Sequence, residues 1–170
     1  EGLLVSAPQP FLANIRHRSG DQGMSITSKG QIALGTEFRS GHVWTNNNVS
    51  EQKAHFISVM ASEDGTTVTF DQFAFGVNLQ VHGIPSGPIS VGLNRGQSYV
   101  IAMHVSGSGS VSEINALNGT RIRANKPVAV LSGSINSGAL GGGRDMGVAQ
   151  IVPVESLGSE WVAIRGSGSG

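Results

Sequence analysis

Short runs of β-branched and aromatic residues recur along this chain about every 8–12 residues, and turn-forming residues separate them. The separating clusters are rich in Gly, Asn, Asp and Ser. No window shows apolar residues at the i, i+3, i+4, i+7 spacing of an amphipathic helix. We therefore predict an all-β fold, an antiparallel β-sandwich of jelly-roll-like or immunoglobulin-like type, preceded by an irregular N-terminal arm.

Three pairs of these runs are predicted to form hairpins. Asp64-Gly65 allows positive φ in the first turn, and Pro127 keeps Lys126 out of the helical region in the third. The expected hairpins are His55–Ala61 with Thr66–Phe70, Ile89–Leu93 with Ser98–His104, and Thr120–Arg123 with Val128–Ser132. Two further strands are expected at Val148–Val154 and Glu160–Ile164.

The composition of the chain limits the classes of molecule that it can be expected to bind. The chain has 170 residues, enough for one domain with a real core, and only 13% of them are charged. Its formal net charge is +0, and the basic residues are scattered, so we expect no nucleic-acid partner. Arg121 and Arg123 share one face of a strand, which we interpret as solvated.

Cysteine is absent, which excludes disulfides and thiolate metal sites. No apolar run has the ~18–20 residues of a transmembrane helix, so no membrane insertion is expected. The chain begins at Glu1 without a signal peptide, so we expect a mature or excised piece of a longer precursor.

Several motifs in the last part of the chain occur in a familiar order. They are Gly119-Thr120-Arg121, Lys126–Gly133, Gln150–Pro153 and Leu157–Val162, and Gly35–Phe38 fits the start of the same pattern. Together they resemble the N-terminal domain of IgGFc-binding protein and its relatives, over about residues 35–164 and most strongly over 118–163. The resemblance implies an extracellular or cell-surface binding and adhesion module rather than an enzyme. We divide the chain into an N-terminal arm (1–30), a sandwich domain (31–165) and a Gly/Ser tail (166–170).

Candidate contact residues lie in two expected loops. A Gly-rich stretch at Ser137–Met146 is long enough to form part of a contact surface at one end of the sandwich. Phe70, Phe73 and Phe75 form a partly alternating strip that we assign to the core. The candidate binding residues are Trp44, Asn46, Asn47, Leu140, Arg144 and Asp145.

Ions and glycans have their own candidates. Asp64 and Asp145 are the candidate Ca²⁺ ligands, with ordinary turn chemistry as the alternative, and no other cofactor is expected. Asn48 and Asn118 fit the Asn-x-Ser/Thr pattern of N-glycosylation.

No nucleophile, base and orienting group can be assembled from the sequence, so we expect a non-catalytic protein. The predicted function is a protein-interaction or adhesion module that binds an extracellular protein or glycoprotein. The alternative is a self-assembling structural subunit of an extracellular filament or matrix. In that case, copies would exchange the apolar N-terminal arm, Glu1–Ile15.

Overall fold

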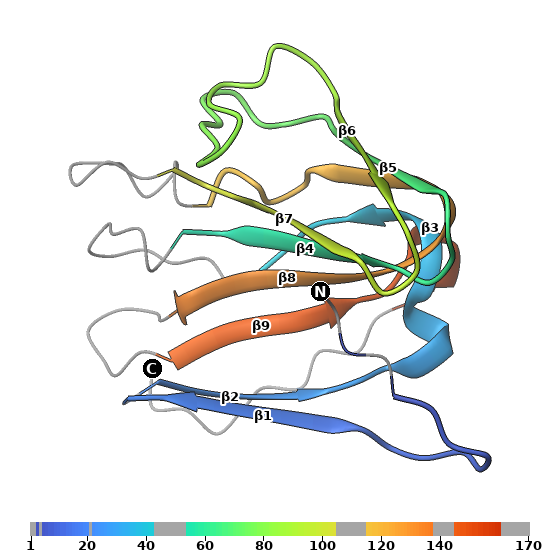
Figure 1. The fold of residues 1–170 in the computed structure, drawn as a ribbon. Coiled ribbons are helices and arrows are strands. Elements are labelled where there is room, and N and C mark those ends of the chain that lie inside the picture. The colour runs from blue at the N-terminus through green and yellow to red at the C-terminus, as the bar shows by residue number, and fades with distance from the viewer. Residues whose placement is uncertain are drawn as a thin grey trace.

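The computed structural model of the chain describes residues 3, 5–20, 22–42, 54–104, 115–137 and 145–160. No described residue lies in an α-helix, so the all-β prediction is confirmed. The elements, shown in Figure 1, are β1 (Asn14–Ser19), β2 (Gln22–Thr27), the 3-10 helix η1 (Gly30–Ala33), β3 (Leu34–Arg39), β4 (Phe56–Ala61), β5 (Thr66–Asp71), β6 (Ile89–Leu93), β7 (Ser98–Ala102), β8 (Arg121–Ser137), β9 (Asp145–Ile151) and the 3-10 helix η3 (Val154–Ser156).

The long strand β8 lies at the centre of the main sheet. Its first half pairs with β5 on one side and β3 on the other, and its second half pairs with β4 and β9. The strand order is β6-β5-β8-β4-β7, with β3 and β9 joined to β8 outside this path. The sheet curls around one hydrophobic core, as expected for a β-sandwich (Figure 1).

The three predicted hairpins are wrong. Within the described residues, β4 and β5 do not pair with each other, because both run antiparallel to β8, one after the other. Likewise β6 pairs with β5, and β7 pairs with β4. Apart from Thr120, the segments predicted as two strands at Thr120–Arg123 and Val128–Ser132 belong to the one strand β8.

The predicted turns lie side by side and bend the sheet instead of reversing the chain. We call the line formed by residues 62–65, 94–97 and 125–127 the crease. Asp64 Oδ1 accepts the backbone N–H of Arg95 at 2.9 Å, and Asn94 Oδ1 accepts that of Gly65 at 3.2 Å. Asn125 Oδ1 accepts the Thr67 N–H at 2.7 Å. Side chains of one turn therefore accept the backbone hydrogen bonds of the turn or strand beside it. In β-sandwiches, strands that pass from one layer to the other at such bends form the corners.

Alternation decides which side chains enter the core. In β4 the odd-numbered residues Ile57, Val59 and Ala61 are buried, so they form the inward face of the strand. In β5 the even-numbered residues face inward, with Val68 and Phe70 fully buried. The crease between the two strands thus shifts the alternation by one residue, as a bulge does.

Two motifs that carry the family resemblance meet at the end of the sheet. Gly35 on β3 lies so close to Pro153, just before η3, that an added Cβ would overlap the proline ring. The Thr36 N–H donates to Glu155 Oε1 at 3.1 Å, and Phe38 is fully buried. These residues are therefore required for packing. The predicted strand Val148–Val154 instead ends at Ile151 because η3 begins at Val154.

The predicted N-terminal arm contains a regular hairpin. β1 and β2 form a separate two-stranded sheet, joined by a turn that includes Gly20 at φ +58°. This hairpin lies beside β9 at the lower edge of Figure 1. Ile26 of β2 is buried, whereas all six residues of β1 are exposed. The hairpin is therefore anchored to the body through β2.

We predict that Gly35→Ala destabilises the protein by about 1–3 kcal/mol, because the new methyl group overpacks against Pro153. The matched control is Gly92→Ala on β6, where an added Cβ has no heavy atom within 4 Å. This control should change the free energy of unfolding by no more than about 0.5 kcal/mol. Urea denaturation measures both values, and equal effects would refute the packing assignment.

Candidate functional site

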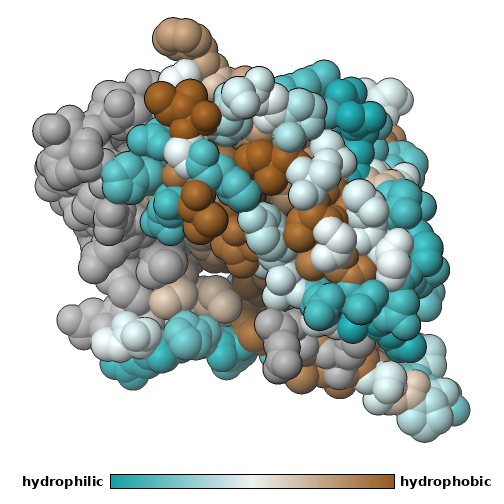
Figure 2. Space-filling view, turned by 45° about the horizontal axis from the view of Figure 1, so that its top comes forward, coloured by the Kyte–Doolittle hydropathy of each residue, from teal (hydrophilic) through white to brown (hydrophobic). Residues whose placement is uncertain are grey.

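The loop between β5 and β6, residues 72–88, exposes three large apolar side chains. Phe75 is fully exposed, and Val81 and Ile84 are 80% and 76% exposed. In Figure 2, which turns the top of Figure 1 toward the viewer, hydrophobic side chains lie on the surface among hydrophilic ones. Loops of this length that have no regular structure of their own are uncommon in compact domains, and many are functional. We refer to residues 72–88 as the apolar loop.

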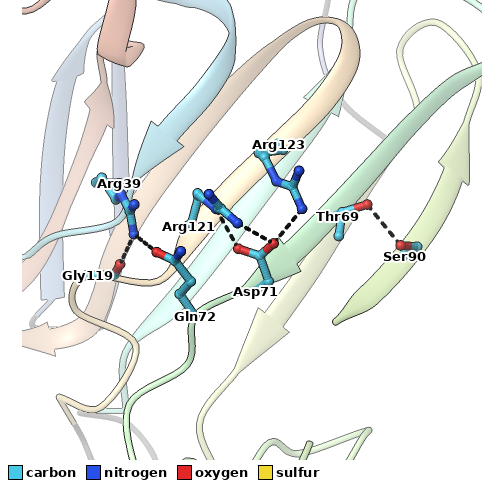
Figure 3. Close-up of polar contacts among 8 residues, drawn as sticks. All are labelled: Arg39, Thr69, Asp71, Gln72, Ser90, Gly119, Arg121 and Arg123. Atoms are coloured by element: carbon cyan, nitrogen blue, oxygen red, sulfur yellow. Dashed lines mark hydrogen bonds and ion pairs between the residues drawn. The ribbon is translucent and has the colours of Figure 1, made fainter. Parts of the chain in front are cut away.

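An ion cluster fixes the residue from which the apolar loop departs. The Arg121 guanidinium binds both carboxylate oxygens of Asp71, at 2.7 and 3.0 Å, and Arg123 Nη2 lies 2.7 Å from Oδ2 (Figure 3). Both guanidinium groups lie against Asp71, which is only 7% exposed. The Arg121 hydrogen bond is the largest factor that lowers the pKa of Asp71, and the Arg123 hydrogen bond acts in the same direction. Both arginines share one face, as predicted, and that face holds the loop.

Gln72 begins the loop in an unusual backbone conformation. Its φ is +55°, a left-handed value that a residue other than glycine seldom adopts. Its Oε1 accepts a hydrogen bond from Arg39 Nη1, which also donates to the Gly119 carbonyl at 3.3 Å (Figure 3). Such conformations persist where surrounding contacts hold them in place. The chain therefore leaves the sheet at a determined angle.

The middle of the apolar loop is attached to the core. Val77 and Leu79 are each 2% exposed, so they anchor the loop among the core side chains. Leu79 and Gly83 exchange backbone hydrogen bonds at 2.7 and 2.9 Å, and the Gln80 N–H donates to the Ala102 carbonyl of β7 at 2.9 Å. The loop is thus held both at its start and at its middle.

Phe75 occupies the apex of a tight turn. The Val77 N–H donates to the Ala74 carbonyl at 3.3 Å, and Gly76 has φ +83°, a value that suits glycine at this place in a turn. The aromatic ring is therefore presented on a backbone with little freedom left. A backbone that is already ordered loses little conformational entropy on binding, and aromatic anchors often dominate interfaces.

The prediction that Phe75 belongs to the core is wrong, although it holds for Phe70, which is fully buried, and for Phe73, which packs against the core. The strip ends because β5 ends at Asp71, before the last two phenylalanines. The signal that could have identified Phe75 is Gly76, which marks a turn at that point rather than a continuing strand.

The predicted contact residues Trp44, Asn46, Asn47, Leu140 and Arg144 lie outside the described residues, as do Trp161–Ile164 and the glycosylation candidate Asn48. Asp145 is described, and it begins β9. Its Oδ1 accepts the Gly23 N–H at 2.5 Å, so this carboxylate attaches the N-terminal hairpin to the body.

The remaining candidates have structural contacts. Asp64 Oδ1 is engaged at the crease, and no group of three or more His, Asp or Glu side chains capable of holding a metal occurs in the described part of the chain. Asn118 is half-buried, and its Oδ1 accepts the His42 N–H at 2.9 Å. Ca²⁺ binding and glycosylation at these positions stay predictions.

A serine and a histidine meet inside the fold. His55 Nε2 lies 2.7 Å from Ser132 Oγ, and the rings of His55 and His42 are 4.2 Å apart. A nucleophile and its base need this contact, but His55 and Ser132 are 0% and 1% exposed, so a substrate has no access. Burial, together with the smaller effect of the neighbouring His42, lowers the pKa of His55 to about 3. Burial also lowers the pKa of His42, while a hydrogen bond with Asn115 opposes the shift.

Comparison with known proteins gives a family match. The family described as IgGFc binding protein matches residues 24–170, which begin inside β2 and leave out β1. No curated protein and no solved structure matches the chain. The family fits an extracellular, protein-binding module. None of the described residues lies in a helix long and apolar enough to cross a membrane.

We predict that the protein loses stability between pH 7 and pH 5. His55 has a pKa of about 3 when folded and 6.5 as its reference value, so the unfolded chain binds the extra proton. The stabilisation is complete above pH 6.5 and is lost as the pH falls toward 3, by about 2 kcal/mol between pH 7 and 5. In urea denaturation, His55→Gln should flatten this slope, whatever its effect at pH 7. An unchanged slope would contradict the assignment.

Proposed function

The chain belongs to the IgGFc binding protein family, and from this premise we propose that it is a non-catalytic module that binds another extracellular protein through the apolar loop. Its place would be outside the cell or on the cell surface. The observation that carries the proposal is the full exposure of Phe75 on a loop whose base and middle are fixed. An exposed aromatic side chain on an ordered turn is suited to enter a pocket on a partner.

The polar contacts around the loop support this interpretation. The ion cluster at Asp71 and the hydrogen bonds of Leu79 and Gln80 restrict the loop before any partner arrives. A loop that has already lost its conformational freedom binds at a smaller entropic cost. Exposed apolar groups held in this way favour an interface over a packing defect.

The name of the family makes the Fc part of IgG the first partner to test. In biolayer interferometry with immobilised Fc, we expect the wild-type chain to bind. Phe75→Ser should weaken this binding about thirtyfold, the size of an interface hot spot. The fully exposed position should leave stability nearly unchanged.

The matched control is Ile32→Ser in η1, which removes an apolar side chain that is 67% exposed at another place on the surface. It should bind like the wild type. Equal binding by the Phe75 variant would refute the role of the loop, and no binding by the wild type would refute Fc as the partner.

A second candidate function is self-assembly through the N-terminal arm. The observation that favours it is the exposure of apolar residues ahead of the hairpin, where Leu3 is 78%, Phe11 51% and Leu12 79% exposed. Such residues would be buried if the arm packed on a neighbouring copy. The body would then supply a repeating unit of a filament or matrix.

Light scattering coupled to size-exclusion chromatography tests this candidate over a range of concentrations. Assembly predicts species heavier than 17.5 kDa for the full chain and a return to monomer in the double variant Phe11→Ser, Leu12→Ser. Ile32→Ser again serves as the control and should assemble. A wild-type monomer at every concentration, or assembly of the double variant, would reject the idea.

A further inference from the structure

Within the part of the chain that the structure describes, no strand lies against the outer edge of β1, although the hairpin to which β1 belongs is anchored. Among the described residues, β1 pairs with β2 alone, and all six of its side chains are exposed. A two-stranded sheet is only marginally stable by itself and gains from a third strand. We propose that this edge receives an extended acidic segment of a partner polypeptide as an added strand. The proposed site is separate from the apolar loop and does not depend on it.

The register identifies the backbone groups that face this edge. Asn14 lies opposite Thr27 and Ser19 opposite Gln22, and the Ser28 N–H donates to the Ala13 carbonyl at 2.9 Å. Hydrogen-bonded pairs alternate with non-bonded pairs in an antiparallel ladder, so the odd-numbered residues of β1 bond to β2. The N–H and C=O groups of Asn14, Arg16 and Arg18 therefore point away from β2, toward the open edge.

The opposite edge of the hairpin is already occupied. The Gly23 N–H donates to Asp145 Oδ1 at 2.5 Å, and the Lys29 N–H donates to Gln150 Oε1 at 2.7 Å. Lys29 Nζ also reaches the Gln150 carbonyl at 2.6 Å. Side chains of β9 thus hold β2 where a further strand would lie. The edge of β1 is therefore the one available for strand addition.

Charge specifies the kind of segment. Arg16 and Arg18 lie on the same face as Asn14, and each uses its Nε for a contact within the hairpin, with Asn14 Oδ1 at 3.1 Å and the Gly20 carbonyl at 3.3 Å. These contacts direct two guanidinium groups along the exposed face. An added strand with carboxylates at alternate positions would place them opposite the two arginines, which is favourable in cross-strand pairs.

A second copy of β1 is a poor occupant of the edge. Antiparallel pairing of two β1 strands in the register that aligns all three outward residues would bring Arg16 opposite Arg16 of the other copy. Like charges directly opposite destabilise a sheet. Strand addition itself provides the affinity through main-chain bonds, and the alternating side chains provide the specificity.

The test uses the full chain and two labelled, blocked nonapeptides. In one, glutamate alternates with threonine, and in the matched control glutamine replaces every glutamate. Fluorescence anisotropy at low salt should show tighter binding of the acidic peptide. The double variant Arg16→Gln, Arg18→Gln should weaken it about five- to thirtyfold.

The comparison of Arg16→Pro with Arg16→Gln isolates the main-chain contribution. Both variants remove the charge, but only proline removes the outward N–H, and the ladder with β2 does not use this group. Proline should weaken binding about three- to tenfold beyond glutamine. Bound acidic peptide should also slow hydrogen exchange at the Arg16 and Arg18 amides.

Two results would overturn the proposal. Equal binding by the proline and glutamine variants, without protection of the amides, would make this a surface for polyanions in general. If neither peptide binds the wild-type chain, strand addition does not occur at this edge. The two arginines would then serve to prevent the edge from pairing with other chains.

Discussion

The backbone pairing of β8 with four other strands is the interaction on which the rest of this structure depends. β3 and β5 bond to its first half, and β4 and β9 bond to its second half. β8 runs through both halves of the curled sheet. Its bend at residues 125–127 therefore determines where the strands beside it bend. The crease is the line along which β4 passes into β5 and β6 passes into β7.

The same strand positions the candidate site. Arg121 and Arg123 project from the first half of β8 to Asp71, the last residue of β5, and Arg39 reaches Gln72 from β3. The departure of the apolar loop is therefore determined by three neighbouring strands. Val77 and Leu79 then return the loop to the core, which leaves Phe75 on the surface. The position of this exposed aromatic ring therefore depends on the pairing of β3, β5 and β8, which are far apart in the sequence.

The second proposed surface is attached more loosely. The hairpin of β1 and β2 contacts β9 through side chains of Asp145 and Gln150, without a backbone ladder between β2 and β9 among the described residues. The family match begins at residue 24, so β1 lies outside it. The match therefore covers most of β2 and the main sheet, whereas β1, which carries the two arginines, precedes it.

Local sequence was sufficient to determine the class of fold and part of the core. The pattern of Phe70 and Phe73 assigned both residues to the core, where Phe70 is fully buried and Phe73 packs against the buried side chains. The alternation of side chains along a strand also placed Arg121 and Arg123 on one face. Side-chain alternation is a property of each strand alone, so a short window of sequence contains it.

The tertiary structure alone decided what the turn residues do and which apolar residues stay outside. Ser62–Gly65 has the composition of a hairpin turn, yet it bends the chain because β8 offers partners to both flanking strands. Phe75 has the pattern of a core residue, yet Gly76 and the ion cluster at Asp71 hold it in solvent. Strand partners come from distant parts of the chain, and their hydrogen bonds outweigh local preference, so neither outcome is contained in the nearby sequence.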